Sequence, residues 1–324
     1  MTKVAVLDDW QGIARTSADW SALEARAEVI FFAQPFRNQD DAQEKLADFD
    51  IVLSMRERTP LPASLIHRLP RLRMLGITGM ANRSLDLDAC TAREIVVAKT
   101  IGKGPYRNAT AELALGLMLA VARSIPAADA NMKAGRFQDG LPAGTSLSGK
   151  TIGIVGLGKL GTQMARYCKA LGMNLLAWSP NLTSERAEAE GGTLVSKQEL
   201  LSRSDVVSIH MVLSPRSRGL IGAADLALMK HGAILVNTSR GPIVDESALL
   251  AALQSGRIRA GLDIYGQEPL PALDPLRRAP NVVLTPHLGY CVEETWQEYY
   301  PQSVENALAF LDGKPVRVVN PEVL

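Results

Sequence analysis

The chain has 324 residues, a length that predicts about two domains. Hydrophobic residues make up 47% of it, enough for buried cores, and a net charge of +1 with no cluster of Lys and Arg argues against a nucleic-acid or anionic-membrane partner. The three cysteines match neither a disulfide framework nor a metal site, and no apolar run reaches membrane-spanning length, so we expect a reduced cytoplasmic protein with no bound metal.

The first hundred residues alternate between short apolar runs and helical stretches. We expect strands at Val4–Leu7, Val29–Phe32, Ile51–Leu53, Leu72–Leu75 and Ile95–Ala98, and helices at Asp40–Asp48, Pro62–Arg68 and Leu85–Ala92. This alternation predicts a parallel sheet with helices on its faces. The opening residues, MTKVAVLDDW, are expected to form a strand followed by acids and not a signal peptide.

Two loops in this region lie at the ends of predicted strands. One is Ser54–Thr59, with the sequence SMRERT, and the other is Ile77–Ser84, with the sequence ITGMANRS. Ligands of open α/β sheets bind at the carboxyl ends of strands, so both loops are candidate binding segments. The two arginines of the first loop, Arg56 and Arg58, are equally compatible with solvated surface charges.

A polar break at residues 100–108, TIGKGPYRN, is a candidate crossover between two lobes. A long amphipathic helix is expected next, at about Ala109–Ala134, and Gly135–Ser148 is expected to be a loop. The small residues on one face of that helix suit close packing, in the core, between lobes or at a dimer interface.

The segment Thr151–Gly161, TIGIVGLGKLG, carries the clearest local signal in the chain. An apolar strand is followed at once by Gly156, Gly158 and Gly161, and then by a helical pattern. In this context G-x-G-x-x-G indicates a dinucleotide site: the glycines allow a tight turn, approach of the pyrophosphate to the backbone, and close packing of helix on strand. The helix N-terminus would then offer N–H groups to the phosphates.

The rest of the chain predicts a second doubly wound sheet. Strands are expected at Ile152–Val155, Asn174–Ala177, Val206–His210, Ala233–Asn237, Ala260–Asp263 and Val282–Leu284, with helices at Leu160–Leu171, Lys197–Arg203, Ala223–Met229 and Glu246–Ser255. A long helix, Glu293–Asp312, and a possible strand, Val316–Val319, complete the chain. We therefore expect two α/β lobes with a cleft between them.

The choice of dinucleotide is left open by the residues after the second strand of this sheet. An acid that binds the ribose hydroxyls is usual there, but the chain has Ser179, Pro180 and Asn181. Without an acid a 2′-phosphate is not repelled, yet no arginine follows immediately, the nearest being Arg186. We expect NAD or NADP.

Candidate catalytic residues also lie at strand ends. His210 and His287 both end apolar strands, whereas His67 and His231 are expected at the surface. A histidine suits proton exchange with a hydroxyl. Arg240 could hold a carboxylate through its planar fork, and Glu268 could orient a histidine and stabilise its charged ring.

Five motifs together resemble the D-isomer-specific 2-hydroxyacid dehydrogenases. They are GKTIGIVGLGKLG, DVVSIHMVLSPRSRGLI, LMKHGAILVNTSRGPIVDESALLAAL, AGLDIYGQEPLP and NVVLTPHLGY, with looser matches at LGITGMANRSLDLDAC and TAELALGLMLAVAR. The resemblance implies two doubly wound parallel-sheet lobes. A Rossmann NAD(P)-binding domain would span 101–292, and a flavodoxin-like substrate domain would combine 1–100 with 293–324.

The resemblance also implies roles for residues. Arg240 would bind substrate, Glu268 would support the histidine, and His287 rather than His210 would be the acid/base. Residues implied at the cofactor are Gly156, Gly158, Lys159, Leu160, Gly161, Ser179, Asn181, His210, Thr238 and Asp263, the last near the nicotinamide carboxamide. Residues implied at the substrate are Arg56 and the loop Thr78–Ala81, chiefly Thr78, Gly79 and Met80, which would hold the carboxylate by backbone N–H groups.

The implied function is hydride transfer between NAD(P)H and C2 of a small 2-oxo acid, as in glyoxylate or hydroxypyruvate reductases. The family is usually a homodimer joined through the cofactor lobes. Two alternatives remain: a D-3-phosphoglycerate dehydrogenase, whose phosphorylated substrate Arg56, Arg58 and Arg83 could serve, and an NAD(H)-sensing corepressor on the same fold. The loop GMANRS departs from the family's usual GVGxDN, His231 and Val212 replace common prolines, and Ser179 replaces the usual acid.

Overall fold

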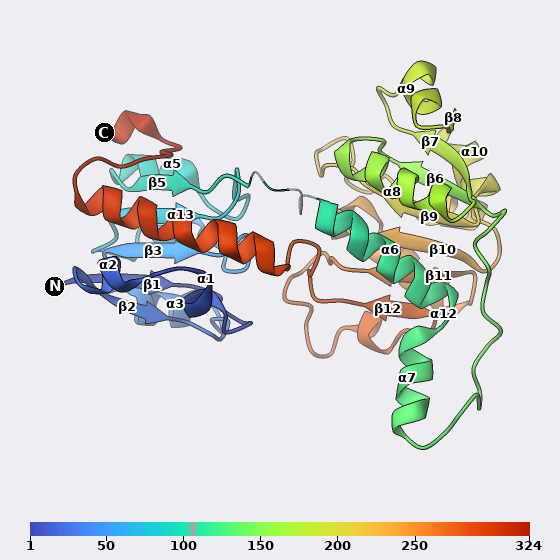
Figure 1. The fold of residues 1–324 in the computed structure, drawn as a ribbon, viewed down its shortest axis with the longest axis horizontal. Coiled ribbons are helices and arrows are strands. Elements are labelled where there is room, and N and C mark those ends of the chain that lie inside the picture. Colours follow the sequence, from blue (N-terminus) through green and yellow to red (C-terminus); the bar gives the residue numbers. More distant parts are fainter. Residues whose placement is uncertain (103, 105–107) are drawn as a thin grey trace. The chain divides into compact units, whose positions relative to one another are not determined.

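A computed structural model describes residues 1–102, 104 and 108–324 of the chain (Figure 1). The chain divides into two compact units. Unit 1 comprises Met1–Arg107 with Val292–Leu324, and unit 2 comprises Asn108–Cys291. The break predicted at 100–108 contains residues 103 and 105–107, which lie outside the described residues.

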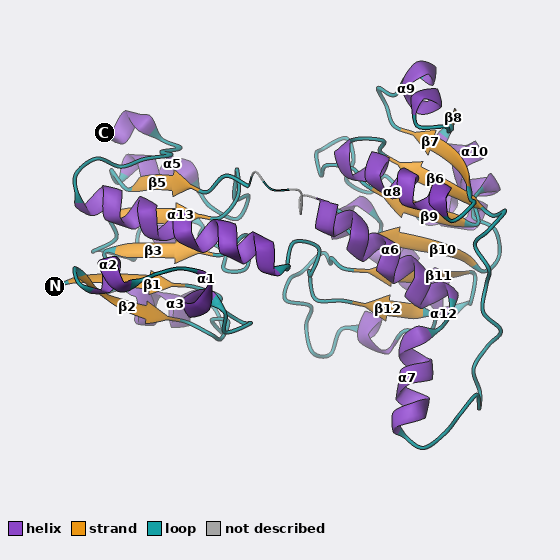
Figure 2. Ribbon diagram, in the orientation of Figure 1, coloured by secondary structure: helices purple, strands orange, loops and turns teal. Residues whose placement is uncertain are grey.

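Within its described residues, unit 1 is built on a five-stranded sheet in which all paired strands are parallel. The strand order is β2-β1-β3-β4-β5, the flavodoxin-like order expected from the resemblance. The strands are β1 (Thr2–Val6), β2 (Ala27–Phe31), β3 (Ile51–Ser54), β4 (Met74–Ile77) and β5 (Val96–Lys99). The helices are α1 (Ala14–Ser17), α2 (Ser21–Glu24), α3 (Gln39–Leu46), α4 (Ala63–Ile66), α5 (Leu87–Ala92) and α13 (Glu293–Leu311), the last of which crosses one face of the sheet (Figure 2).

Within its described residues, unit 2 is built on a seven-stranded parallel sheet of order β12-β11-β10-β9-β6-β7-β8. The strands are β6 (Thr151–Val155), β7 (Asn174–Trp178), β8 (Thr193–Leu194), β9 (Val206–Ile209), β10 (Ala233–Asn237), β11 (Ile258–Leu262) and β12 (Val282–Leu284). The helices are α6 (Ala109–Ala122), α7 (Ile125–Lys133), α8 (Lys159–Ala170), α9 (Ser184–Ala189), α10 (Lys197–Arg203), α11 (Ala223–Leu228) and α12 (Glu246–Gln254). This is the Rossmann order, in which the chain direction across the sheet reverses between β6 and β9.

Two sequence-based predictions are wrong. The single helix expected at Ala109–Ala134 is two helices, α6 and α7, that meet at Ser124 with a bend of 65°. Ser124 adopts a left-handed backbone conformation (φ 53°), and Pro126, in the first turn of α7, has no N–H with which to continue α6. The segment Val316–Val319 is not a strand: a single antiparallel bridge joins Val318 to Ala98.

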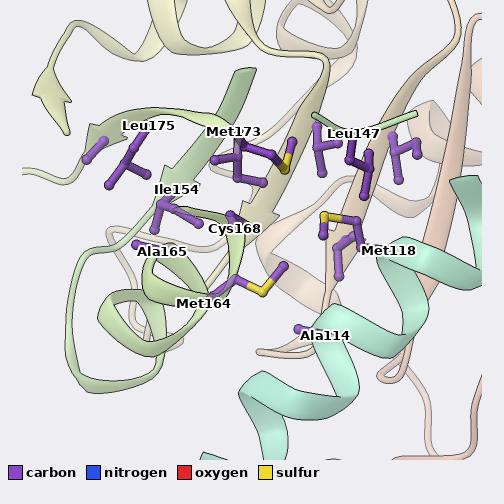
Figure 3. Close-up of a cluster of buried hydrophobic side chains, with 14 of the residues drawn as sticks. Ala114, Met118, Leu147, Ile154, Met164, Ala165, Cys168, Met173 and Leu175 are labelled. Atoms are coloured by element: carbon purple, nitrogen blue, oxygen red, sulfur yellow. The ribbon is translucent and has the colours of Figure 1, made fainter. Parts of the chain in front are cut away.

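Unit 2 has two hydrophobic cores: one lies between its sheet and the helix pair α6 and α8 (Figure 3), and the other joins the sheet to α10, α11 and α12. Met118 of α6 meets Met164 and Cys168 of α8 and Ile154 of β6 in one fully buried cluster. Cys168 is thus a buried free thiol. Among the described residues no single helix has the length and hydropathy of a membrane span; α6 and α7 reach them only when joined across their bend.

Candidate active site

The glycine turn after β6 leaves open space beside the start of α8. Gly156 has φ +99°, and a Cβ there would lie 2.7 Å from the carbonyl oxygen of His210. A Cβ on Gly161 would lie 2.0 Å from the Gly156 oxygen, whereas one on Gly158 would meet no atom of the described residues within 4 Å. Gly156 and Gly161 therefore serve the packing of the turn, and Gly158 keeps its outer side clear at the helix N-terminus, where Lys159 and Leu160 begin α8.

Two buried polar atoms lie at the carboxyl edge of the neighbouring strands. The Nδ1 of His210, after β9, and the Oγ1 of Thr238, after β10, have no hydrogen-bond partner within the described chain. The other ring nitrogen of His210 lies 2.9 Å from Ser208 Oγ, and burial lowers the pKa of this histidine to about 4. Unpartnered buried donors and acceptors are rare, so these atoms and the open Gly158 position together fit a bound dinucleotide.

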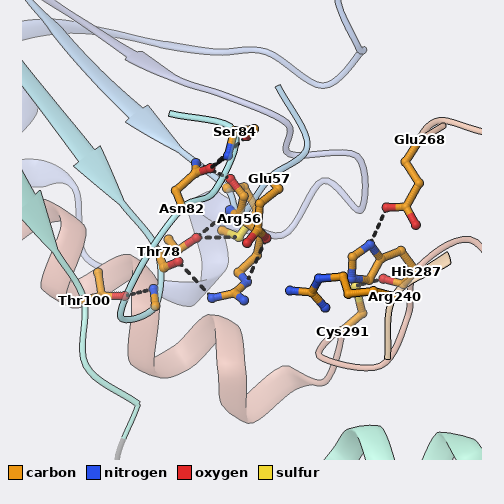
Figure 4. A network of polar contacts seen from close by, with 12 residues as sticks. Arg56, Glu57, Thr78, Asn82, Ser84, Thr100, Arg240, Glu268, His287 and Cys291 are labelled. Atoms are coloured by element: carbon orange, nitrogen blue, oxygen red, sulfur yellow. Dashed lines mark hydrogen bonds and ion pairs between the residues drawn. The ribbon is translucent and has the colours of Figure 1, made fainter. Parts of the chain in front are cut away.

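His287 and Glu268 form a close pair in unit 2 (Figure 4). The Nδ1 of His287 lies 2.6 Å from Oε2 of Glu268, and the Oε1 of Glu268 accepts the Tyr265 N–H at 2.8 Å. His287 follows β12 with a left-handed backbone (φ 55°), and its ring stands edge-on to Tyr290 with centroids 5.5 Å apart. The carboxylate thus holds one ring nitrogen in place and directs the other away from itself.

The buried carboxylate of Asp263 organises the loop that carries His287. Its oxygens accept the Thr285 hydroxyl at 2.6 Å, the Leu288 N–H at 2.7 Å and the Gly289 N–H at 2.9 Å. Its backbone oxygen accepts the His287 N–H at 2.8 Å. Burial raises the pKa of Asp263, against the opposing effect of these hydrogen bonds. Asp263 is therefore at least a positioning residue for His287, a role that its sequence position did not indicate.

Arg240 follows β10, one strand away from the end of β9. Its backbone oxygen accepts the Asn237 amide at 3.1 Å, and its Nη1 donates to the Ser239 oxygen at 2.7 Å. The Ser239 hydroxyl in turn donates to the Ile209 oxygen at 3.0 Å, which ties this turn to β9. The arginine is therefore held at the carboxyl edge of the same sheet as the glycine turn.

The two loops predicted to bind ligand in unit 1 are joined through Arg56 (Figure 4). Its backbone N–H donates to Thr78 Oγ1 at 2.7 Å, and its Nη1 donates to the Thr78 oxygen at 3.1 Å. Gly79 has φ +86°, and a Cβ there would lie 1.9 Å from Arg56 Nη1, so only glycine leaves room for this guanidinium.

The N–H of Gly79 already has a partner inside unit 1. It donates to the buried Thr100 Oγ1 at 2.9 Å, whereas Met80 extends outward with 60% of its surface exposed. Asn82 fixes the rest of the loop by donating to the Arg56 oxygen and accepting from Ser84. The backbone N–H groups of Met80 and Ala81 donate to no acceptor within the described residues and are the ones beside Gly79 that could receive a carboxylate.

Sequence reasoning missed Thr100 and Thr285, and it named Arg186 only as the arginine nearest to the residues after β7. Arg186, on α9, donates through Nη2 to the Leu157 oxygen inside the glycine turn at 3.3 Å, although 29 residues separate the two. Ser179 and Asn181 follow β7 beside that turn, since the Gly156 N–H donates to the Trp178 oxygen at 2.8 Å. Only a contact between distant segments brings Arg186 here, and no local pattern signals it.

Fold and site together define the chain as a dinucleotide-binding α/β protein. A family model described as D-isomer specific 2-hydroxyacid dehydrogenase, NAD binding domain, matches residues 115–289. The chain belongs to this family, as its motifs indicated, and its second unit is an NAD-binding domain.

Named relatives and a solved structure agree with that assignment. The chain is 36% identical over 287 residues to the glyoxylate reductase of Korarchaeum cryptofilum, covering 87% of this chain and 86% of that protein. It is 39% identical over 264 residues to the D-3-phosphoglycerate dehydrogenase of Archaeoglobus fulgidus, covering 81% of this chain and 50% of that protein, so it spans about half the length of that curated relative. A crystal structure of a phosphoglycerate oxidoreductase from Vibrio cholerae O395 matches with a TM-score of 0.90 at 33% identity, over 97% of this chain and 100% of that one.

Proposed function

We propose that this chain is an NAD(P)-dependent D-2-hydroxyacid dehydrogenase that acts on C2 of a small 2-oxo or 2-hydroxy acid. The observation that carries the proposal is the 2.6 Å contact between His287 Nδ1 and Glu268 Oε2. The pair lies at the carboxyl edge of the sheet that also carries Arg240 and the glycine turn. A histidine oriented by a carboxylate is suited to exchange a hydroxyl proton.

Each residue of the proposed site has a distinct task. Gly156, Gly158 and Gly161, with the start of α8, would hold the pyrophosphate, and His210 and Thr238 would supply polar contacts to the cofactor. The dinucleotide held there would supply or accept the hydride at C2. Arg240 would hold the substrate carboxylate and polarise the C2 oxygen. The Nε2 of His287 would give or take the hydroxyl proton, while Glu268 stabilises the charged ring through Nδ1.

Unit 1 would supply the remaining hydrogen bonds to the substrate. The proposal assigns 1–107 with 292–324 to substrate binding, through the Met80 and Ala81 amides, and 108–291 to the cofactor. Arg56, fixed against Thr78, keeps a cation beside this loop. A carboxylate accepts readily from paired backbone N–H groups near a guanidinium.

The first test measures the oxidation of NADH and of NADPH through the fall in their absorbance. Glyoxylate, hydroxypyruvate, pyruvate and 3-phosphohydroxypyruvate are assayed in parallel as substrates. Turnover of at least one acid is expected, and His287→Ala should lower kcat by about 10²- to 10⁴-fold while the dissociation constant of the cofactor changes less than about twofold. Near-wild-type turnover by the variant would refute the assignment of His287. Binding of a dinucleotide without turnover of any acid would refute the proposed reaction.

A phosphorylated substrate is the second candidate, favoured by a further cation in unit 1. The guanidinium of Arg58 lies 4.5 Å from the ring centroid of Trp10 and 5.4 Å from that of Trp296, and its Nη1 donates to the Asp8 oxygen at 2.6 Å. Stacking between two indoles would fix the position of this cation, which could then bind the phosphate of a substrate that also has a carboxylate. A lower KM for 3-phosphohydroxypyruvate than for glyoxylate would support a D-3-phosphoglycerate dehydrogenase.

We further propose a cytoplasmic homodimer joined through unit 2. Large apolar side chains of α7 and the loop after it are exposed: Ile125 at 51%, Met132 at 59% and Phe137 at 67%. Exposed apolar side chains gathered on one segment favour a protein partner, and a second copy of this chain would cover them. The free thiols of Cys90, Cys168 and Cys291 fit a reducing compartment.

A further inference from the structure

We propose that the chain prefers NADP(H) to NAD(H), and that Arg186 and Ser179 bind the 2′-phosphate of the adenosine ribose. The inference rests on the proposed dinucleotide site and adds to it a phosphate subsite at the end of β7. It is carried by the placement of Arg186 against the glycine turn, together with the residues that follow β7.

The end of β7 lies directly beside the glycine turn. Val155 and Trp178 are opposite each other in the parallel pair β6 and β7, and the Gly156 N–H donates to the Trp178 oxygen at 2.8 Å. Ser179 is the next residue along the chain. In a Rossmann fold this position faces the adenosine ribose, because the pyrophosphate lies on the turn itself.

Arg186 reaches the same turn from α9. The Oγ1 of Thr183 caps this helix, and the guanidinium extends back so that Nη2 donates to the Leu157 oxygen at 3.3 Å. Leu157 is the residue between Gly156 and Gly158. A guanidinium has five N–H donors, so one bond to Leu157 anchors the side chain and leaves other donors for an anion.

The charge of Arg186 is not neutralised by a carboxylate within the described residues. Arg166, on the neighbouring α8, differs in this respect, since its guanidinium is paired with Glu190 at 3.0 Å. The nearest acid in sequence to Arg186, Glu185, has a lowered pKa because it accepts hydrogen bonds from its own N–H and from Thr183, in the first turn of α9. The Glu185 carboxylate is thus engaged by Thr183 and its own N–H, and no ion pair joins it or another described carboxylate to the Arg186 guanidinium.

The three residues directly after β7, Ser179, Pro180 and Asn181, include no acid to oppose a phosphate. An aspartate or glutamate there accepts hydrogen bonds from both ribose hydroxyls of NAD and repels the 2′-phosphate of NADP. Ser179 instead offers a hydroxyl that can donate to a phosphate oxygen, and Asn181 offers an amide. The anchored guanidinium, the serine hydroxyl and the absence of an acid directly after β7 act together. They define a site suited to the dianionic 2′-phosphate of NADP rather than to the 2′-hydroxyl of NAD.

Equilibrium binding of NADP⁺ and NAD⁺ by calorimetry tests the inference without requiring turnover. The wild-type chain should bind NADP⁺ at least about 10-fold more tightly than NAD⁺. Arg186→Gln should weaken NADP⁺ binding by about 10- to 100-fold and change NAD⁺ binding by less than about threefold, while Arg186→Lys should restore part of the preference. Ser179→Asp should make NAD⁺ the tighter ligand.

Arg203→Gln is the matched control, because it removes one positive charge from unit 2 at an exposed side chain of α10 whose 3.9 Å ion pair is with Glu199. It should leave both affinities unchanged. Equal weakening of both nucleotides by Arg186→Gln would show that Arg186 only shapes the turn, and tighter NAD⁺ binding by the wild type would overturn the inference. Failure of both nucleotides to bind the wild type would instead refute the proposed dinucleotide site.

Discussion

His287 Nδ1 and Glu268 Oε2 lie 2.6 Å apart, although the two residues are 19 positions apart in the chain. Each partner is fixed by backbone bonds: the Tyr265 N–H holds the other oxygen of Glu268, and the Asp263 oxygen accepts the His287 N–H. The pair is therefore preorganised by the two loops that follow β11 and β12.

Replacing Glu268 by Gln should lower kcat by about 100-fold or more, because an amide does not stabilise a charged imidazole as a carboxylate does. Steady-state kinetics with the best 2-oxo acid, together with the dissociation constant of the reduced cofactor, would measure this. Glu246→Gln is the matched control, since Glu246 Oε1 accepts the Gly266 N–H at 2.6 Å in the same region. Equal losses in the two variants would contradict the assigned role.

The glycine turn offers a pair of substitutions that separate folding from binding. Gly161→Ala should destabilise unit 2, because its Cβ would lie 2.0 Å from the Gly156 oxygen. Gly158→Ala should leave the melting temperature within about 2 °C of the wild type, since no atom of the part of the chain that the structure describes lies within 4 Å of the new Cβ, yet weaken dinucleotide binding at least about 10-fold. Tight binding by Gly158→Ala would place the pyrophosphate elsewhere.

Unit 1 should lose stability as the pH rises through the titration of Asp8. Its Oδ2 is buried without a hydrogen-bond partner in the described part of the chain, and burial raises its pKa to about 6. Between the unfolded value of 3.8 and the folded value of about 6 the folded chain binds more protons than the unfolded chain. The free energy of unfolding should therefore fall by about 3 kcal/mol across this window, and Asp8→Asn should abolish the fall.

Denaturant unfolding between pH 4 and pH 8 would measure this, by the fluorescence of Trp10, Trp20 and Trp296 in unit 1. Asp41→Asn is a control for which the expected change in the free energy of unfolding has the opposite sign to that of Asp8→Asn. Hydrogen bonds from Arg37 and Lys45 lower the pKa of Asp41 to about 2. The stabilisation of the folded state by this carboxylate is therefore fully present above pH 3.8 and is lost as the pH falls towards 2. At pH 7 Asp41→Asn should destabilise unit 1, whereas Asp8→Asn should stabilise it; the same sign for both would refute the account.

The proposed dimer depends on the exposed apolar side chains after α6. Phe137→Glu should shift the mass measured by light scattering from dimer to monomer, because a charge placed there cannot be covered by a second copy. Leu273→Glu is the matched control, as Leu273 is 84% exposed elsewhere in unit 2 and should leave the mass unchanged. A wild-type monomer at micromolar concentration would refute the dimer.

Local sequence patterns determined most of the helices and strands. The strand, glycine turn and helix of Thr151–Gly161 occur as predicted, because apolar strand residues, glycines and a helical repeat specify this geometry within a dozen positions. The prediction of one helix at Ala109–Ala134 was wrong, because the apolar repeat continues across Ser124 while the backbone turns there.

The site depended on contacts that no local pattern contains. Residue types at strand ends left His210 and His287 as equal candidates until the family resemblance distinguished them. The fold buries the first against Ser208 and sets the second against Glu268. Two other contacts likewise join residues more than 20 positions apart: Arg186 donates to the Leu157 oxygen, and the Asp263 carboxylate accepts the Leu288 N–H in the loop that carries His287. Sequence alone determined which side chains end each strand; the order of the strands in the sheet decided which of them meet, because side chains distant along the chain come within bonding distance only once the sheet is assembled.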